Sequence, residues 1–326
     1  MRVAVLAGGR SSEHDVSLRS AATVARGLQE AGHEVVTVTI GRSGEWRVGE
    51  APVTLEAGAG LLDTDAVFPA LHGPFGEDGS VQGLLEHLDV PYVGSDVLAS
   101  AICIDKLTLK RLCAQGGVPQ VEFVAVDPDR PWRDECAQLG LPLWVKPSRL
   151  GSSVGISRVV RLEELDAAAE LALRHDPRVI VEAAAPAAAL EVECSVLGNE
   201  PGALETSPPG QLAVNADWYD YEAKYQAGGM DLIIPAPLPD DQLAHIRTLA
   251  AEIFTLAGCS GLARCDFFAE PGGQVLVNEV NTMPGFTETS VYAKLFEAGG
   301  LAYPDLCDRL VRLGIERHQK ARSYEF

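Results

Sequence analysis

Short apolar runs alternate with helically spaced apolar positions through the first hundred residues. Continuous apolar runs bounded by turn residues are typical of buried strands, and apolar residues that recur every three or four positions are typical of helices. The pattern predicts strands at residues 3–6, 34–40 and 66–71, helices at 16–30 and 81–88, and a last short strand at 91–94. A strand, a glycine turn, a helix and a second strand favour a doubly wound parallel sheet, which we expect as an N-terminal domain over residues 1–100.

A second set of elements follows. The pattern predicts a single helix at 101–115, strands at 143–146, 155–159 and 179–182, and a helix at 163–173. The alanine-rich stretch 183–189 is interrupted by Pro186, which favours a connector rather than a continuous element. We therefore expect a central domain over residues 101–185.

A third domain is expected over residues 186–326. The pattern predicts a strand at 191–197, helices at 240–257 and 302–313, a hairpin at 262–281, and a loosely held charged tail at 316–326. Residues 205–234 show no clean period, and a loop of this length is usually functional, often as a lid over a site. The expected fold class is α/β, with α+β character after the first domain.

The hairpin places four polar side chains on one face. Gly272-Gly273 is a good two-residue turn between two apolar runs, and counting outward pairs Asp266 with Glu279 and Arg264 with Asn281. Two carboxylates directly opposite each other repel unless a cation lies between them. Two carboxylates and an amide oxygen are ligands that suit Mg²⁺ or Mn²⁺ and not zinc. The alternative is a solvated hairpin face without a metal.

Charge and cysteine usage narrow the function classes. The 326 residues carry 26 Lys and Arg against 46 Asp and Glu, a formal net charge of −20, so neither nucleic acid nor an anionic membrane is an expected partner. No window holds the roughly 18 apolar residues of a membrane span, and the first apolar run is too short for a signal peptide. Seven cysteines without a CxxC pair suit reduced, mostly buried thiols, so a cytoplasmic protein is expected.

A loop rich in glycine and serine follows the predicted strand at 143–146. Glycines allow backbone N–H groups to approach phosphate oxygens, and the hydroxyls of Ser152 and Ser153 add donors. Lys146, at the end of the strand, adds a point charge that suits phosphate. The segment is not a P-loop, because no GxxxxGK[ST] occurs in the chain. An ordinary surface loop is the alternative.

Five segments in order resemble the D-alanine–D-alanine ligase family of the ATP-grasp superfamily. They are GGRSSEHDVS (8–17), LHGPFGEDG (71–79), VKPSRLGSSVG (145–155), YDYEAKY (219–225), and RCD (264–266) with NEVNTMPGFT (278–287). The resemblance extends from residue 3 to about residue 310. It implies a two-part ATP-grasp fold after the N-terminal domain, and the ATP-dependent joining of two D-alanines for peptidoglycan precursors through a D-alanyl phosphate and a tetrahedral intermediate.

The resemblance also implies which residues bind ATP and metal. Phosphates are expected at Lys106 and Lys146, with the serine loop closing over them, adenine near Glu182 and the ribose hydroxyls at Glu191. Two Mg²⁺ or Mn²⁺ ions are expected at Asp266, Glu279 and Asn281, and dependence on a monovalent cation stays open. Lys224 and Tyr225 are expected on the lid, over the site when it is closed.

The substrate residues follow from the same resemblance. Glu13 is expected to bind the ammonium group of the first D-alanine, with Tyr225 hydrogen-bonded to Glu13 and Ser152, and His72 is expected near the first carboxylate. Arg264 and the Gly285 N–H are expected to stabilise the tetrahedral oxyanion, and Ser290 to bind the second carboxylate. Without the resemblance, Glu13 and Ser290 are equally typical of helix caps, and His72 of a structural histidine.

Three alternatives remain. A ligase that joins D-alanine to D-lactate is disfavoured by Lys224-Tyr225, because relatives that use D-lactate lack this pair, whereas D-serine stays open. A glutathione-synthetase-type ligase is disfavoured by the segments around Glu13 and His72. A non-catalytic nucleotide-binding module is disfavoured because the metal and oxyanion residues are all present. Ala183 departs from many relatives, and Thr289 departs from some. A homodimer through the N-terminal domain is expected, and the general base stays unassigned.

Overall fold

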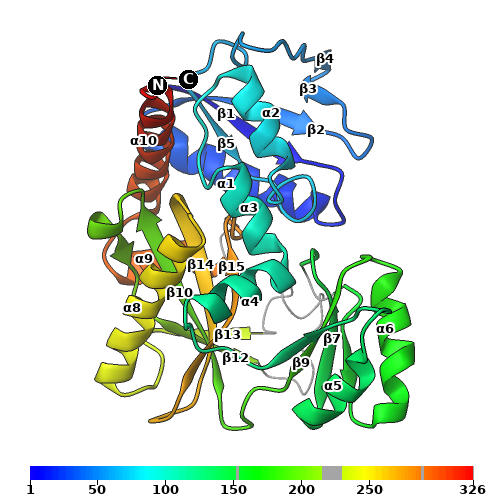
Figure 1. The fold of residues 1–326 in the computed structure, drawn as a ribbon. Helices are drawn as coiled ribbons and strands as arrows, with labels where there is room; N and C mark the ends of the chain where they lie inside the picture. The colour runs from blue at the N-terminus through cyan, green and yellow to red at the C-terminus, as the bar shows by residue number, and fades with distance from the viewer. Residues whose placement is uncertain (152–153, 215–229, 288–289, 326) are drawn as a thin grey trace.

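The computed structural model describes residues 1–151, 154–214, 230–287 and 290–325, and three sheets organise it (Figure 1). The N-terminal sheet lies at the top of the view beside the C-terminal helix α10, and both chain ends meet there. The central and C-terminal sheets lie side by side below it, with the helices α3 and α4 passing between the layers. The three sheets are separate, with no strand shared between them.

The N-terminal sheet has the order β4-β3-β2-β1-β5, with β1, β2 and β5 parallel and β3 and β4 antiparallel. Alternate residues of β1 enter two different cores, one shared with α1 and α10 and the other with α2. The predicted doubly wound sheet is therefore confirmed, although residues 91–94 supply only a single bridge, from Tyr92 to Val67. The elements are β1 (Arg2–Gly8), α1 (His14–Glu30), β2 (Glu34–Ile40), β3 (Trp46–Val48), β4 (Ala51–Pro52), β5 (Ala66–Pro69) and α2 (Ser80–Leu88).

The central sheet is antiparallel, with the order β6-β9-β7-β8. Its strands bury alternate apolar side chains against α5 and α6, as the period of two requires. The opposite face carries Lys146 and Glu182 and is turned away from that core. The elements are β6 (Phe123–Ala125), α5 (Trp132–Leu139), β7 (Leu143–Pro147), β8 (Ser157–Val159), η1 (Leu162–Glu164), α6 (Leu165–Leu173) and β9 (Val179–Ala183).

The C-terminal sheet is antiparallel, with β13-β12-β10-β14-β15 in order and β11 paired to β10. α8 packs on one face, and its apolar stripe shares a core with the odd-numbered residues of β14. The expectation of a structureless segment at 205–234 is wrong at its ends, which form β11, β12 and β13 on the sheet edge. The elements are β10 (Leu190–Gly198), η2 (Pro201–Ala203), β11 (Glu205–Thr206), β12 (Gly210–Val214), β13 (Met230–Ile233), α8 (Asp240–Leu256), β14 (Gly261–Ala269), β15 (Val275–Asn281) and α9 (Val291–Ala298).

The predicted single helix at 101–115 is two helices, α3 (Val97–Ile104) and α4 (Lys106–Gln115). Asp105 separates them in an extended conformation, with φ −85° and ψ 95°. Its carboxylate accepts the Thr108 N–H at 3.1 Å and caps α4. A cap of this kind competes with helix continuation, and therefore the apolar period runs through a break that it does not reveal.

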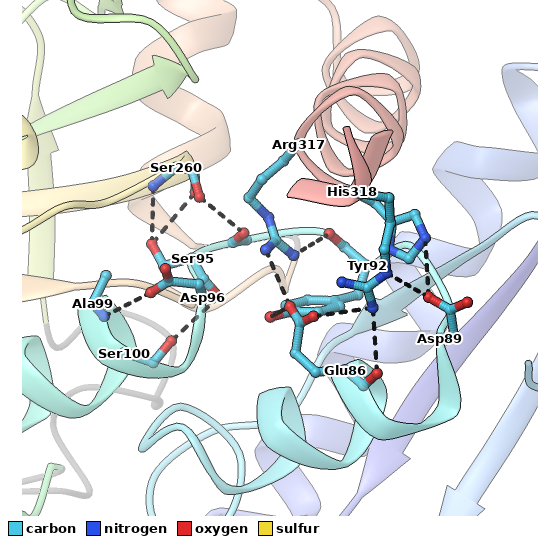
Figure 2. Close-up of polar contacts among 12 residues, drawn as sticks. Glu86, Asp89, Tyr92, Ser95, Asp96, Ala99, Ser100, Ser260, Arg317 and His318 are labelled. Carbon is cyan, nitrogen blue, oxygen red and sulfur yellow. Dashed lines mark hydrogen bonds and ion pairs between the residues drawn. The ribbon is translucent and has the colours of Figure 1, made fainter. Parts of the chain in front are cut away.

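The expectation of a loose charged tail is also wrong. α10 (Tyr303–Arg322) continues through it and lies against the segment that follows α2. Figure 2 shows Arg317 over Tyr92 and beside Glu86, with the guanidinium carbon 4.1 Å from the ring centroid. At Gly314 an added Cβ would lie 2.5 Å from the Tyr92 carbonyl oxygen, and so the helix approaches this backbone closely. Ion pairs that no hydrophobic period predicts hold the tail in place.

All seven cysteines are buried, as expected for structural thiols. Among the described residues, no helix is long and apolar enough to cross a bilayer.

Candidate active site

One cavity of about 730 Å³ lies between the central sheet, the C-terminal sheet and the loops that precede α1 and follow β5. Its lining combines side chains from segments that are far apart in the sequence. They are Glu13, His72 and Glu77 from the N-terminal part, Lys106, Trp144, Lys146 and Glu182 from the central part, and Glu191, Glu193, Arg264, Asp266, Asn278, Glu279, Asn281, Gly285 and Ser290 from the C-terminal part.

The β14–β15 hairpin supplies the acidic wall. Arg264 pairs with Asn281 and Asp266 with Glu279, as predicted. The predicted two-residue turn is wrong, because Glu270 and Gln274 close a three-residue turn and the pairing near it is displaced by one. Between the pairs Asp266–Glu279 and Phe267–Val277, β15 has one extra residue, Asn278, which forms a bulge. This bulge offsets the displacement and returns the polar side chains to the predicted pairing.

Arg264 is held by two carboxylates on neighbouring strands. Its guanidinium donates to both Asp266 oxygens, at 2.8 and 2.7 Å, and lies 2.9 Å from the Glu193 carboxylate. Burial would lower the pKa of Arg264, but Asp266 and Glu193 together raise it well above its ordinary value. The cavity therefore contains a fixed cation. The Asn281 amide also donates to Asp266, at 3.1 Å.

The acidic wall fits a hard divalent cation. Within the described ranges no group of three or more His, Cys, Asp or Glu side chains could hold a metal. The expected metal site has only two such side chains, Asp266 and Glu279, and its third member is the amide of Asn281. Asp266 and Glu279 face each other on adjacent strands, and Asn281 adds a third side chain with an oxygen donor, all on the cavity wall. Opposed carboxylates require a cation between them, and Arg264 supplies one for Asp266 in this structure.

Lys106 and Lys146 form a basic wall of the cavity, and the buried Lys110 lies behind it. Lys146 lies 2.6 Å from Glu182, and Lys110 lies 3.1 Å from the other oxygen of the same carboxylate. Burial would raise the pKa of Glu182, but the two lysines outweigh it and lower the pKa to about 2. Lys106 donates to the Leu150 carbonyl at 2.9 Å and lies 3.5 Å from Glu279, and so it joins the two walls.

Carboxylates from the N-terminal part line the cavity, one of them beside Gly151. Glu13 occupies the N-cap position of α1 but makes no side-chain cap, and an added Cβ at Gly151 would lie 3.6 Å from its carboxylate. The helix-cap alternative for Glu13 is therefore wrong. Glu77 accepts the Gly73 N–H at 2.7 Å, and burial and the nearby Glu13 charge raise its pKa to about 8.

His72 is engaged on both sides of its ring. Nδ1 lies 3.2 Å from the Met283 carbonyl and Nε2 lies 2.8 Å from the Ser20 hydroxyl. Burial lowers the pKa of His72, which keeps the ring neutral. These contacts match the structural histidine that the sequence left open.

Gly285 and Ser290 lie together at the C-terminal edge of the cavity. The Ser290 hydroxyl accepts the Thr287 N–H at 2.8 Å, and an added Cβ at Gly285 would lie 2.9 Å from it. Ser290 makes no side-chain cap for α9, and so the helix-cap alternative is wrong here too.

Comparison with known proteins agrees with this geometry. The family model described as "D-ala D-ala ligase C-terminus" matches residues 112–312, and "D-ala D-ala ligase N-terminus" matches residues 2–60 and 50–95. The chain belongs to the D-alanine–D-alanine ligase family. A D-alanine–D-alanine ligase of Deinococcus radiodurans is 47% identical, over 97% of this chain and 98% of that protein.

Two solved structures of the family share the fold. The D-alanine–D-alanine ligase from Coxiella burnetii superposes with a TM-score of 0.88 at 34% identity, covering 99% of this chain and 96% of that one. The VanG D-Ala:D-Ser ligase from Enterococcus faecalis superposes with a TM-score of 0.86, also at 34% identity, covering 96% and 99%. The family likeness therefore extends over the whole chain, and members with different second substrates share it.

Within this family frame, some expected residues lie outside the described part of the chain. They are Ser152, Ser153, Lys224 and Tyr225, and Thr289, the departure beside Ser290, lies outside it as well. All other predicted site residues line the cavity.

Sequence reasoning missed three charged side chains of the site: Glu77, Lys110 and Glu193. Glu77 lies inside the recognised segment 71–79, and Lys110 lies one helical turn after Lys106. Glu193 lies two residues after Glu191 and therefore on the same face of β10, where it opposes Asp266. Alternation along 190–198 was the signal that could have identified it.

Proposed function

We propose that this protein joins two D-alanines to D-alanyl-D-alanine at the expense of ATP, releasing ADP and phosphate, in the synthesis of peptidoglycan precursors. The observation that carries the proposal is a single cavity with a lysine wall, an opposed carboxylate–arginine wall, and Glu13 between them. The names of the relatives at 47% and 43% identity support it. A carboxylate is a poor electrophile, and such a cavity can activate it by phosphorylation.

Lys106 and Lys146 would bind the ATP phosphates. Burial would lower the pKa of Lys146, but Glu182 raises it above its ordinary value, and so Lys146 stays charged. Lys106 follows Asp105 at the start of α4, where the helix dipole adds a positive field. Ser152 and Ser153 would add donors, and the strand that ends at Glu182 would contact adenine.

Metal and nucleotide contacts would converge on the hairpin. Asp266, Glu279 and Asn281 would hold two Mg²⁺ or Mn²⁺ ions, which when bound neutralise phosphate charge during transfer. Glu191, at the start of β10, would bind the ribose hydroxyls. Dependence on a monovalent cation is left to experiment.

The chain's own residues would then direct two steps. Glu13 would bind the ammonium group of the first D-alanine. The carboxylate of that D-alanine would take the γ-phosphoryl group of ATP, and ADP would leave. The amine of the second D-alanine, its carboxylate bound at Ser290, would attack the D-alanyl phosphate. Arg264 and the Gly285 N–H would stabilise the oxyanion until phosphate leaves.

Water must be excluded while the acyl phosphate exists. Lys224 and Tyr225 would close over the cavity and exclude water, with Tyr225 hydrogen-bonded to Ser152 and Glu13. We further place the enzyme in the cytoplasm, where ATP is available, as a homodimer formed through its N-terminal part.

The test is phosphate release from ATP and Mg²⁺ with D-alanine alone, D-alanine plus D-serine, D-alanine plus D-lactate, and L-alanine, with the product identified by mass. D-alanine alone should give D-alanyl-D-alanine, and L-alanine should give no comparable turnover. Release with only a mixed pair would instead make it a ligase of the D-Ala:D-Ser or D-Ala:D-lactate kind. Release with none of them would contradict the proposal.

A further inference from the structure

Two fixed points flank Gly285 in the loop that follows β15. On one side the Met283 carbonyl contacts His72 Nδ1 at 3.2 Å, and on the other the Phe286 N–H donates to the Ser20 hydroxyl at 3.3 Å. Among the described residues, the Gly285 N–H itself has no acceptor, and Gly285 lines the cavity. The donor is thus held by its neighbours and left open to a ligand.

The same hydroxyl connects the two fixed points. A carbonyl can only accept, so His72 carries its proton on Nδ1, and Nε2 must accept from the Ser20 hydroxyl, 2.8 Å away. The Ser20 hydroxyl therefore accepts a hydrogen bond from the Phe286 N–H and donates one to His72 Nε2. This series of hydrogen bonds runs from Phe286 through Ser20 and His72 to Met283, and all four residues are buried.

We propose that Ser20 is a positioning residue, which with His72 fixes the Gly285 N–H where the oxyanion of the ligation step develops. Ser20 lies in α1, the helix that begins beside Glu13, and so one rigid element carries both the anchor for the loop and the residue placed at the first substrate. The inference rests on the proposed function, because it assumes that Gly285 stabilises this oxyanion. A shift of a few tenths of an ångström in such a donor weakens it in the transition state more than in the ground state.

The chain offers a matched control, Ser17, one turn away on the same helix. It is equally buried, and it bonds the Gly8 N–H at 2.9 Å and the Ala70 carbonyl at 2.5 Å. Neither contact touches the Gly285 loop. Ser17→Ala removes a buried hydroxyl from the same helix and reports the stability effect alone.

The test compares Ser20→Ala with Ser17→Ala in dipeptide formation and phosphate release. We expect Ser20→Ala to lower kcat for the dipeptide about 10- to 100-fold, with KM for ATP within about twofold of wild type. It should also release more phosphate than dipeptide, because the acyl phosphate survives long enough to meet water. Ser17→Ala should keep the ratio at wild type. Equal losses in both variants, with equal ratios, would overturn the proposal.

A second arm does not depend on turnover. Hydrogen exchange of the Phe286 amide should accelerate in Ser20→Ala and not in Ser17→Ala, and nitrogen NMR of His72 should show a neutral ring with the proton on Nδ1. An Nε2-protonated ring or unchanged exchange in Ser20→Ala would overturn the link itself. If wild type makes no dipeptide while this arm succeeds, the proposed function has failed and the link stands.

Discussion

At the residue scale, Glu182 illustrates how the cavity keeps its charges. Its carboxylate is buried between Lys146 and Lys110, so its charge is stabilised only while both cations are present. Removing one member of such a buried set costs more than the set itself gains, because the remaining charges lose their partner. The network therefore specifies where Lys146 points more than it adds to stability.

The first prediction concerns the pH dependence of this contribution. The pKa of Glu182 is lowered from 4.5 to about 2, and so its stabilisation is fully present above pH 4.5 and is lost as the pH falls toward 2. Glu182→Gln should lower the free energy of unfolding on the order of 3 kcal/mol at pH 7, and the difference from wild type should shrink below pH 4. Urea unfolding at several pH values measures it. A difference that is independent of pH would contradict the assignment.

A second prediction concerns Glu279. Glu279→Gln keeps the side-chain volume and the strand pairing with Asp266 but removes one of two opposed carboxylates. The fold should stay intact by circular dichroism, while turnover should fall at least about 100-fold, since a bound metal contributes several kcal/mol to the transition state. Full activity in this variant would exclude the metal assignment.

The residues that could be named from sequence are those inside recognisable segments, and the ones that were missed act through contact across elements. Asp266 and Glu279 could be paired by counting from a turn. Alternation could place Glu193 on the polar face of its strand but not opposite Asp266, because that pairing depends on β10 joining the hairpin from far away in the sequence. Ser20 looked like one more small residue of an amphipathic helix, and only the fold brings it to the Gly285 loop.

At the element scale, the hairpin shows how a correct pairing can come from two errors. The turn has three residues, where two were predicted, and this alone would have paired Asp266 with Asn278. The bulge at Asn278 adds the missing residue and restores the pairing with Glu279. A bulge leaves no mark in an apolar run, and therefore the alternation identified the face but not the irregularity that makes it.

The break between α3 and α4 leads to a third prediction. Asp105 caps α4, accepts the Ser148 hydroxyl at 2.8 Å and pairs with Arg178 at 2.9 Å, so it joins the start of the glycine- and serine-rich loop after β7 to the helix that carries Lys106. Asp105→Ala should cost about 1–2 kcal/mol as a lost cap and raise KM for ATP. Asp105→Asn retains a capping oxygen and should recover most of the stability.

Thermal unfolding and the KM for ATP separate these two effects of Asp105. If Asp105→Ala lowered stability and left the KM for ATP at wild type, the break would serve the helices alone and not the binding of phosphate.

At the scale of the whole molecule, the cavity requires the N-terminal part and the hairpin to hold a fixed relation, since Glu13 lies at the start of α1 and Arg264 lies on β14. Two contacts help to fix it, in addition to those that Ser20 and His72 make with the loop after β15. Ser95 and Ser260 exchange hydrogen bonds where the first sheet leads into the helices, and α10 returns from the C-terminal part to lie on α1 and Tyr92 (Figures 1 and 2). The sequence indicated three parts but not that the last helix belongs to the core of the first.

The last prediction tests this connection with two arginines of α10. The Arg317 side chain is 14% exposed and joins Tyr92 and Glu86, whereas that of Arg312 is 68% exposed and, among the described residues, forms its ion pair within its own helix, with Asp308. Arg317→Ala should lower the free energy of unfolding by about 2 kcal/mol through a lost desolvated cation–π contact and ion pair, while Arg312→Ala should stay within about 0.5 kcal/mol of wild type.

If the connection also orients the first-substrate residues, Arg317→Ala should raise the KM for D-alanine with little change in the KM for ATP, because Lys146 lies on the central sheet, which Arg317 does not contact. Initial rates with varied D-alanine at saturating ATP measure the first KM, and initial rates with varied ATP at saturating D-alanine measure the second. Equal stability and equal KM values in the two arginine variants would show that α10 is held by its apolar face alone. In that case the relation of Glu13 to Arg264 would depend on the buried core that α10 shares with α1, and not on the charged contacts at its end.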